Sequence, residues 1–89
     1  MTVEIYTKDY CPYCHRAKAL LDAHDIAYVE YDVTRDPAGQ AEMRARSGAF
    51  TVPQVFANGI SLGGSDELAA LAQTGALDTL LGRASTAVR

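Results

Sequence analysis

Two short apolar runs separated by one continuous helical segment limit the folds open to the first third of the chain. The runs at residues 3–6 and 26–31 are rich in β-branched and aromatic side chains, so they predict buried strands. Residues 12–24 begin with a proline and repeat apolar or half-apolar side chains at helical spacing, at Ala17, Leu20, Leu21 and His24. A helix that connects two strands favours their parallel pairing through a right-handed crossover. The sequence therefore predicts a βαβ unit.

A second helix is predicted after this unit by its capping residues. Asp36 and Pro37 suit the N-cap and first turn of a helix that should end near Ser47, with Gly48 as its left-handed cap. The apolar residues of this segment are mostly alanines, so we expect the helix to pack lightly.

Turn residues organise the rest of the chain. The dipeptide Asn58-Gly59 lies between apolar runs at 52–56 and 60–62 and favours a type I′ hairpin, which predicts two antiparallel strands. Ser65 is predicted to cap a helix that ends at Gly75, and a short last helix should continue to Gly82. The predicted fold class is α/β, with one mixed four-stranded sheet covered by helices on both faces.

Length and composition indicate one small folded domain. The chain has 89 residues, of which 48% are hydrophobic, and this leaves no room for a second core. We expect a domain at 1–82 and a C-terminal tail at 83–89. No apolar run approaches the ~18 residues of a membrane span, and the N-terminus lacks a signal-peptide pattern. A net charge of −3 argues against nucleic acid as the main partner. The expectation is a cytoplasmic monomer without a membrane or nucleic-acid partner.

The chain's two cysteines lie where the first strand signal ends and the helix signal begins. Cys11 and Cys14 are three residues apart, nearly one helical turn, so their sulfurs can meet. The free backbone N–H groups of a helix start stabilise a thiolate, so we expect a lowered pKa for Cys11 and assign it as the nucleophile. A reversible disulfide between Cys11 and Cys14 is the natural interpretation, since cysteines of reducing compartments are more often catalytic, redox-sensing or metal-binding than structural.

A basic collar surrounds the first thiol, although an ordinary solvated helix face explains part of it equally well. It comprises Lys8, His15, Arg16 and Lys18, with Asp9 as the one acidic neighbour. A structural zinc site is disfavoured because zinc needs four ligands, and the remaining candidates, His15 and His24, lie on the same short helix as the cysteines. No metal is expected.

Three motifs in order resemble those of the dithiol glutaredoxins, most closely the small bacterial glutaredoxin 3 subgroup. They are Cys11-Pro12-Tyr13-Cys14 with Lys8 ahead of it, Thr51-Val52-Pro53, and Gly63-Gly64-Ser65-Asp66. The resemblance covers about residues 3–81. It implies a thioredoxin-like fold, thiol–disulfide oxidoreductase activity, glutathione as reductant and co-substrate, and no metal for turnover.

The resemblance also implies a role for each motif residue. Cys11 would attack and Cys14 would resolve the mixed disulfide. Glutathione would be held by its γ-glutamyl end, its cysteinyl backbone and its glycine carboxylate, through Lys8, Tyr13, Thr51, Val52, Pro53, Gly64, Ser65 and Asp66. Pro53 would follow a cis bond that turns the Val52 backbone to the ligand, Asp66 would take the ammonium, and Lys8 the glycine carboxylate. Tyr13 as plain surface, Pro53 as the start of an edge strand and Ser65 as a simple N-cap are the alternatives.

The sequence departs from the family pattern at two places. Ala49 and Phe50 occupy positions where relatives commonly have an arginine for the glycine carboxylate, and Gln40, Arg44 or Arg46 are the candidates to replace it. Ser65 stands where some relatives have a third cysteine.

The partners implied are glutathione, glutathionylated proteins and disulfide substrates such as ribonucleotide reductase. Rival hypotheses are a protein reduced by thioredoxin reductase, a dimeric iron–sulfur carrier, and a simple interaction module. Pro12 and Tyr13 disfavour the iron–sulfur carrier, because relatives with that role usually have a small residue at the position of Pro12.

Overall fold

The computed structural model describes residues 2–81. Along the chain the elements are β1 (Val3–Thr7), α1 (Pro12–Ala23), β2 (Val29–Asp32), α2 (Pro37–Ser47), β3 (Gln54–Ala57), β4 (Ile60–Gly63), α3 (Ser65–Thr74) and α4 (Ala76–Leu80). Gly82, the predicted end of the last helix and of the domain, and the predicted tail at 83–89 lie outside the described residues.

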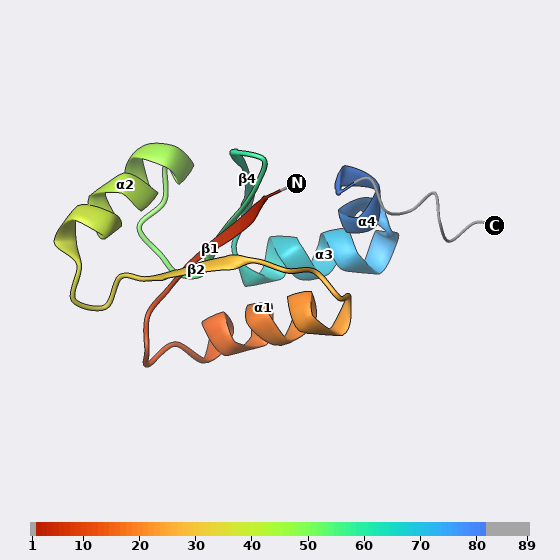
Figure 1. Ribbon diagram of the computed structural model, residues 1–89, viewed down its shortest axis with the longest axis horizontal. Helices are drawn as coiled ribbons and strands as arrows, with labels where there is room; N and C mark the ends of the chain where they lie inside the picture. The colour runs from red at the N-terminus through yellow and green to blue at the C-terminus, as the bar shows by residue number, and fades with distance from the viewer. Residues whose placement is uncertain (1, 82–89) are drawn as a thin grey trace.

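The four strands form one mixed sheet in the order β2-β1-β3-β4 (Figure 1). β1 pairs in parallel with β2 and antiparallel with β3, and β3 pairs antiparallel with β4. α1 and α3 lie on one side of this sheet and α2 on the other (Figure 1). The predicted βαβ unit, hairpin and two-sided helical cover are therefore confirmed.

The larger core lies between the sheet and the pair α1 and α3. Because side chains alternate along a strand, β1 directs Val3 and Ile5 to this side. α1 contributes Ala17 and Leu21, and α3 contributes Leu68, all of which are buried. This packing fixes the start of α1, where the cysteines lie, against the rest of the molecule.

The smaller core lies under α2. It consists of four buried residues, Tyr6, Val33, Met43 and Phe56. Met43 is the one buried residue of α2, which confirms that this helix packs lightly. An ion pair adds to the contact, since Arg46 Nη2 lies 2.8 Å from Glu4 Oε1 on β1.

The second strand starts later than predicted, at Val29 instead of residue 26. Ile26 instead closes α1: Asp25 adopts a left-handed conformation (φ 57°), and the Ile26 N–H donates to the Leu21 carbonyl over 2.9 Å. Its side chain enters the larger core. The apolar character of Ile26 thus belongs to a helix-end motif, in which the residue after the left-handed position packs back on the helix.

The third strand also starts later, at Gln54 instead of residue 52. The Val52–Pro53 peptide bond is cis, and both residues precede β3. In the following hairpin Asn58 and Gly59 both have positive φ, 52° and 82°, as a type I′ turn requires.

The predicted N-cap of α3 is wrong by one residue. Gly64 is the N-cap and Ser65 is the first helical residue. The side chain that satisfies the helix start is Glu67, whose Oε1 accepts the Gly64 N–H over 2.8 Å. This hydrogen bond pairs the N–H of the N-cap residue, and no N-cap side chain pairs the N–H groups of the first turn.

Within residues 2–81, no helix combines the length and the apolar character needed to cross a membrane.

Candidate active site

Cys11 occupies the N-cap of α1, directly after the loop that follows β1. Its backbone is extended (φ −101°, ψ 109°), and its Sγ accepts the Cys14 N–H over 3.1 Å. The first turn of α1 contains no acidic residue. A helix N–H and the positive end of the helix dipole thus both face this sulfur.

The same sulfur also faces the second motif. Cys11 Sγ lies 3.7 Å from the Val52 carbonyl oxygen, in reach of a weak hydrogen bond that the thiol donates. The residue is 7% exposed, so only a small part of it meets solvent. Neither cysteine is in a disulfide, so the site is in its dithiol form.

Cys14 lies one turn into α1 and is buried, with 1% of its surface exposed. Burial, followed by the hydrogen bond with Cys11, raises the pKa of Cys14 to about 12. Cys14 is therefore a protonated thiol near neutral pH, and the two cysteines are chemically distinct before any substrate arrives.

A pocket of about 350 Å³ opens next to the contact between Cys11 and Val52; Val52 is part of its lining, and Cys11 is not. Its lining comes from α1, from the segment before β3 and from the start of α3, through Tyr13, Arg16, Thr51, Val52, Pro53, Gly64, Ser65, Asp66 and Glu67. This volume falls within the range of small-molecule sites, roughly 300–1,000 Å³. Seven residues that the sequence predicted as glutathione contacts thus share one pocket.

Gly64 allows two walls of this pocket to approach each other. A Cβ at this position would lie 3.2 Å from the Pro53 carbonyl oxygen, closer than most such contacts. The absence of a side chain therefore brings the start of α3 against the Val52–Pro53 segment. Asp66 is exposed on the first turn of the same helix.

Two of the lining residues, Arg16 and Glu67, were not predicted as ligand contacts from the sequence. The Arg16 guanidinium lies 5.3 Å from the centroid of the Tyr13 ring, and both residues line the pocket. Their spacing of three residues on one helix was the signal available. Glu67 lines the pocket while its carboxylate caps Gly64, and its position three residues after that glycine was the corresponding signal.

Lys8 is the predicted contact that the structure leaves out of the pocket lining. It is half-buried in the loop after β1, and its carbonyl accepts the Cys11 N–H over 3.3 Å. Its observed contribution is therefore to the backbone that holds the first thiol.

The segment that departs from the family pattern lies outside the pocket lining. Phe50 is 72% exposed, and the Arg44 guanidinium lies 4.8 Å from its ring centroid. The other candidates for the missing arginine have partners elsewhere, since Gln40 donates to the Val33 carbonyl and Arg46 to Glu4.

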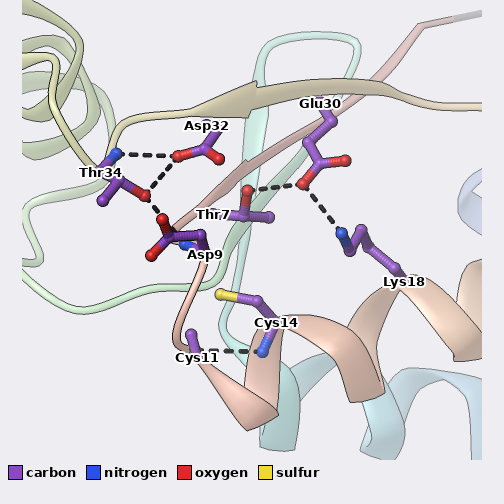
Figure 2. A network of polar contacts seen from close by, with 8 residues as sticks. All are labelled: Thr7, Asp9, Cys11, Cys14, Lys18, Glu30, Asp32 and Thr34. Atoms are coloured by element: carbon purple, nitrogen blue, oxygen red, sulfur yellow. Dashed lines mark hydrogen bonds and ion pairs between the residues drawn. The ribbon is translucent and has the colours of Figure 1, made fainter.

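The basic collar is divided by the structure. Lys18 forms an ion pair with Glu30 of β2, with 3.0 Å between Nζ and Oε2 (Figure 2). His15 is exposed, and His24 is the half-buried C-cap of α1 with its Nδ1 4.0 Å from Asp78. In the described part of the chain, no three residues among His, Cys, Asp and Glu gather as a metal site would require.

Comparisons with known proteins agree on one family. The sequence model described as Glutaredoxin matches residues 3–61. The chain is 51% identical to Glutaredoxin 3 of Escherichia coli K12 over 79 residues, which cover 89% of this chain and 95% of that protein. It is 42% identical to a glutaredoxin of Pseudomonas aeruginosa over 79 residues, covering 89% and 94% of the two chains.

Solved structures show the same likeness. The solution structure of glutaredoxin from Brucella melitensis matches with a TM-score of 0.81 and 47% identity, over 91% of this chain and 88% of that one. The crystal structure of a buckwheat glutaredoxin–glutathione complex matches with a TM-score of 0.81 and 31% identity, over 90% and 76%.

Proposed function

This chain belongs to the glutaredoxin family and is a thiol–disulfide oxidoreductase with a thioredoxin-like fold, and from that premise we propose that glutathione is its reductant and co-substrate. The observation that carries the proposal is the pocket next to the Cys11–Val52 contact, whose lining joins Tyr13, the Val52–Pro53 segment and the start of α3. A glutathione complex among the structural relatives supports the same assignment.

The proposed binding mode uses each wall of the pocket for one part of glutathione. The backbone of Val52 pairs with the cysteinyl part as an added strand would, while Thr51, Pro53 and Tyr13 flank it. The γ-glutamyl end lies at the start of α3 beside Gly64, where Ser65 offers a backbone N–H group and Asp66 a carboxylate. Lys8 lies outside the observed lining, and its ammonium is proposed to pair with the glycine carboxylate from the loop after β1.

The proposed reaction with a glutathione mixed disulfide uses Cys11 alone. The Cys11 thiolate attacks the glutathionyl sulfur, the substrate leaves as a thiolate that takes a proton, and Cys11 is left glutathionylated. A second glutathione thiolate then attacks the glutathionyl sulfur, releases Cys11 and forms glutathione disulfide. The hydrogen bond from the Cys14 N–H stabilises the Cys11 thiolate as nucleophile in the first step and as leaving group in the second.

The proposed reaction with a protein disulfide uses both cysteines. Cys11 attacks one substrate sulfur and forms a mixed disulfide, and Cys14 then attacks Cys11, which releases the reduced protein and leaves the Cys11–Cys14 disulfide. Two glutathione molecules restore the dithiol. Glutathionylated proteins, ribonucleotide reductase as a disulfide substrate, a monomeric state and a cytoplasmic location stay predictions.

The Cys14→Ser variant separates the two routes. It is expected to keep at least about half of the wild-type rate toward a glutathionylated peptide, because that route needs only the first thiol. Reduction of a protein disulfide should fall by about a hundredfold or more, since no second thiol is left to resolve the intermediate. Loss of both activities in a folded Cys14→Ser protein would show that the roles are assigned wrongly.

The reductant is identified by coupled turnover. Wild-type protein is assayed with a glutathione mixed disulfide and NADPH, once with glutathione plus glutathione reductase and once with thioredoxin reductase. The proposal expects steady NADPH consumption with the first pair and only background with the second. Turnover with thioredoxin reductase alone would show that glutathione is not the reductant.

A further inference from the structure

Lys18 is held on the same side of α1 as the buried cysteine. Residues four apart lie on one helix face, so Cys14 and Lys18 are neighbours along the side that meets the sheet. Lys18 Nζ lies 3.0 Å from Glu30 Oε2, and the buried Thr7 hydroxyl donates to the same oxygen over 2.7 Å (Figure 2). The ammonium is thus tied to both β2 and β1, and its side chain is only 23% exposed.

The charge at Lys18 acts on the second thiol. It lowers the pKa of Cys14, in addition to a larger lowering by a hydrogen bond with the Lys8 backbone. Burial and the hydrogen bond with Cys11 outweigh both, so the net shift is upward. The hydrogen bond with Glu30 raises the pKa of Lys18, and the hydrogen bond from Thr7 lowers the pKa of Glu30. Both partners therefore stay ionised across the range in which thiols are assayed, and the ammonium remains available to stabilise an anion beside it.

The dithiol route needs such stabilisation at one step only. Cys14 must attack as a thiolate, yet it is buried, and its backbone N–H donates a hydrogen bond to the Cys11 sulfur that it will attack. We propose that Lys18, held in place by Glu30 and Thr7, is a positioning residue for this resolving step: its ammonium stabilises the Cys14 thiolate and has no part in the steps that use Cys11 alone. This inference rests on the proposed dithiol route.

The step balances without any further reactant. The Cys14 thiol gives its proton to solvent, and the thiolate attacks Cys11 Sγ of the mixed disulfide. The Cys11–Cys14 bond forms as the bond from Cys11 to the substrate sulfur breaks. The substrate sulfur leaves with the electron pair and takes a proton, so the substrate is reduced by two electrons and the cysteine pair is oxidised.

Several other ionisable groups lie around Cys14 and Lys18 and have to be considered in a pH experiment. They are Cys11 at the start of α1, Lys8 and Asp9 in the loop before it, Tyr28, Glu30 and Asp32 from the β2 side, and Asp66 and Glu67 where α3 reaches the pocket. The test therefore compares two steps in one molecule, so that effects common to both cancel.

The experiment follows the release of nitrothiobenzoate after one equivalent of dithiobis(nitrobenzoate) is mixed with reduced protein. The first release reports attack by Cys11, and the second reports attack by Cys14 on the resulting mixed disulfide. In Lys18→Gln the second phase should slow about tenfold near neutral pH, and its pH profile should move up by about one unit, the equivalent of that factor. The first phase should stay within about twofold of wild type.

Three variants make the result specific. Lys18→Arg keeps the positive charge and should restore the second phase to within about threefold of wild type. Arg35→Gln removes the same charge from an 86% exposed side chain and should change neither phase. Glu30→Gln keeps the ammonium and an oxygen that accepts from it, so its second phase should stay within about threefold of wild type. Lys18→Met takes the place of Lys18→Gln if that variant does not fold.

The proposal is overturned by any of four results: an unchanged second phase in Lys18→Gln, both phases slowed alike, no recovery in Lys18→Arg, or a tenfold loss in Glu30→Gln. This experiment does not depend on the proposed reductant. A wild-type protein that is inactive with glutathione would still show both phases. A wild-type protein that releases only one equivalent would contradict the dithiol route itself.

Discussion

Two thiols separated by two residues differ because one caps a helix and the other lies inside it. Cys11 accepts a hydrogen bond from the Cys14 N–H and faces Val52 of the pocket lining. Cys14 is 1% exposed, and its pKa is raised to about 12, chiefly by burial. A reagent or substrate therefore meets one nucleophile, and the second thiol acts only after the first has reacted.

Asp66 is the residue through which the proposed binding mode can be measured. Asp66→Asn should raise KM for a glutathione mixed disulfide about fivefold and leave kcat nearly unchanged. The effect is modest because the carboxylate is exposed, and exposed ion pairs contribute at most about 1 kcal/mol. The measurement is a substrate titration in the assay coupled to glutathione reductase.

The matched control for this substitution is Asp22→Asn. Asp22 is exposed on α1, away from the pocket lining, so both kinetic constants should stay at wild-type values. An equal KM in the Asp66→Asn and wild-type proteins would remove Asp66 from the binding mode.

At the scale of elements, α2 is joined to the sheet by an ion pair as well as by Met43. Arg46 donates to both Glu4 and the Tyr6 hydroxyl, over 2.8 Å in each case. The hydrogen bond with Arg46, followed by that from Tyr31, lowers the pKa of Glu4 below its ordinary value of 4.5. This pair therefore stabilises the folded state above that value and stops doing so as acid protonates the carboxylate.

Arg46→Gln is expected to lower the free energy of unfolding by about 1 kcal/mol near neutral pH. The difference from wild type should shrink as the pH falls below about 4.5, because the wild type then loses the ion pair too. Urea denaturation at a series of pH values measures it. Arg35→Gln, which removes an exposed partner of Asp9, should show no such pH dependence, and a difference for Arg46→Gln that stays constant with pH would contradict the argument.

Element order could be predicted because each element carries a local signal. Pro12, Asp36 and Asn58-Gly59 mark a first turn, an N-cap and a hairpin, and all three lie as expected. Boundaries failed where one residue could serve two purposes. Ile26 is apolar like a strand residue but packs back on α1, and Ser65 suits an N-cap although Gly64 occupies that position.

The site was predictable to the extent that its residues form contiguous motifs. The cysteines and the two segments around Val52 and Gly64 could be read from the sequence, and the structure brings them to one pocket. The different roles of Arg16 and Lys18 could not be predicted from the sequence, since both are basic residues of one helix. Only tertiary structure shows that Arg16 lies over Tyr13 and Lys18 against Glu30.

At the scale of the whole molecule, stability depends on the larger of the two cores, which also holds α1 in place. Leu21 is fully buried there. Leu21→Ala should cost about 3 kcal/mol, a large share of the roughly 5–15 kcal/mol available to a small domain. The measurement is the free energy of unfolding in urea.

Leu80→Ala is the matched control, because Leu80 on α4 is 48% exposed. The same deletion there should change stability by no more than about 0.5 kcal/mol. Comparable losses in the two variants would mean that burial in the larger core does not decide stability.

The sheet order places β2 at one edge, with its four residues exposed. Such an edge offers unpaired backbone groups to any other strand and is a common starting point for aggregation. β2 carries Glu30 and Asp32 in its four residues, so a second copy aligned against it would bring carboxylates together. The strand that anchors Lys18 thus also disfavours edge-to-edge pairing with the sheet of a neighbouring molecule.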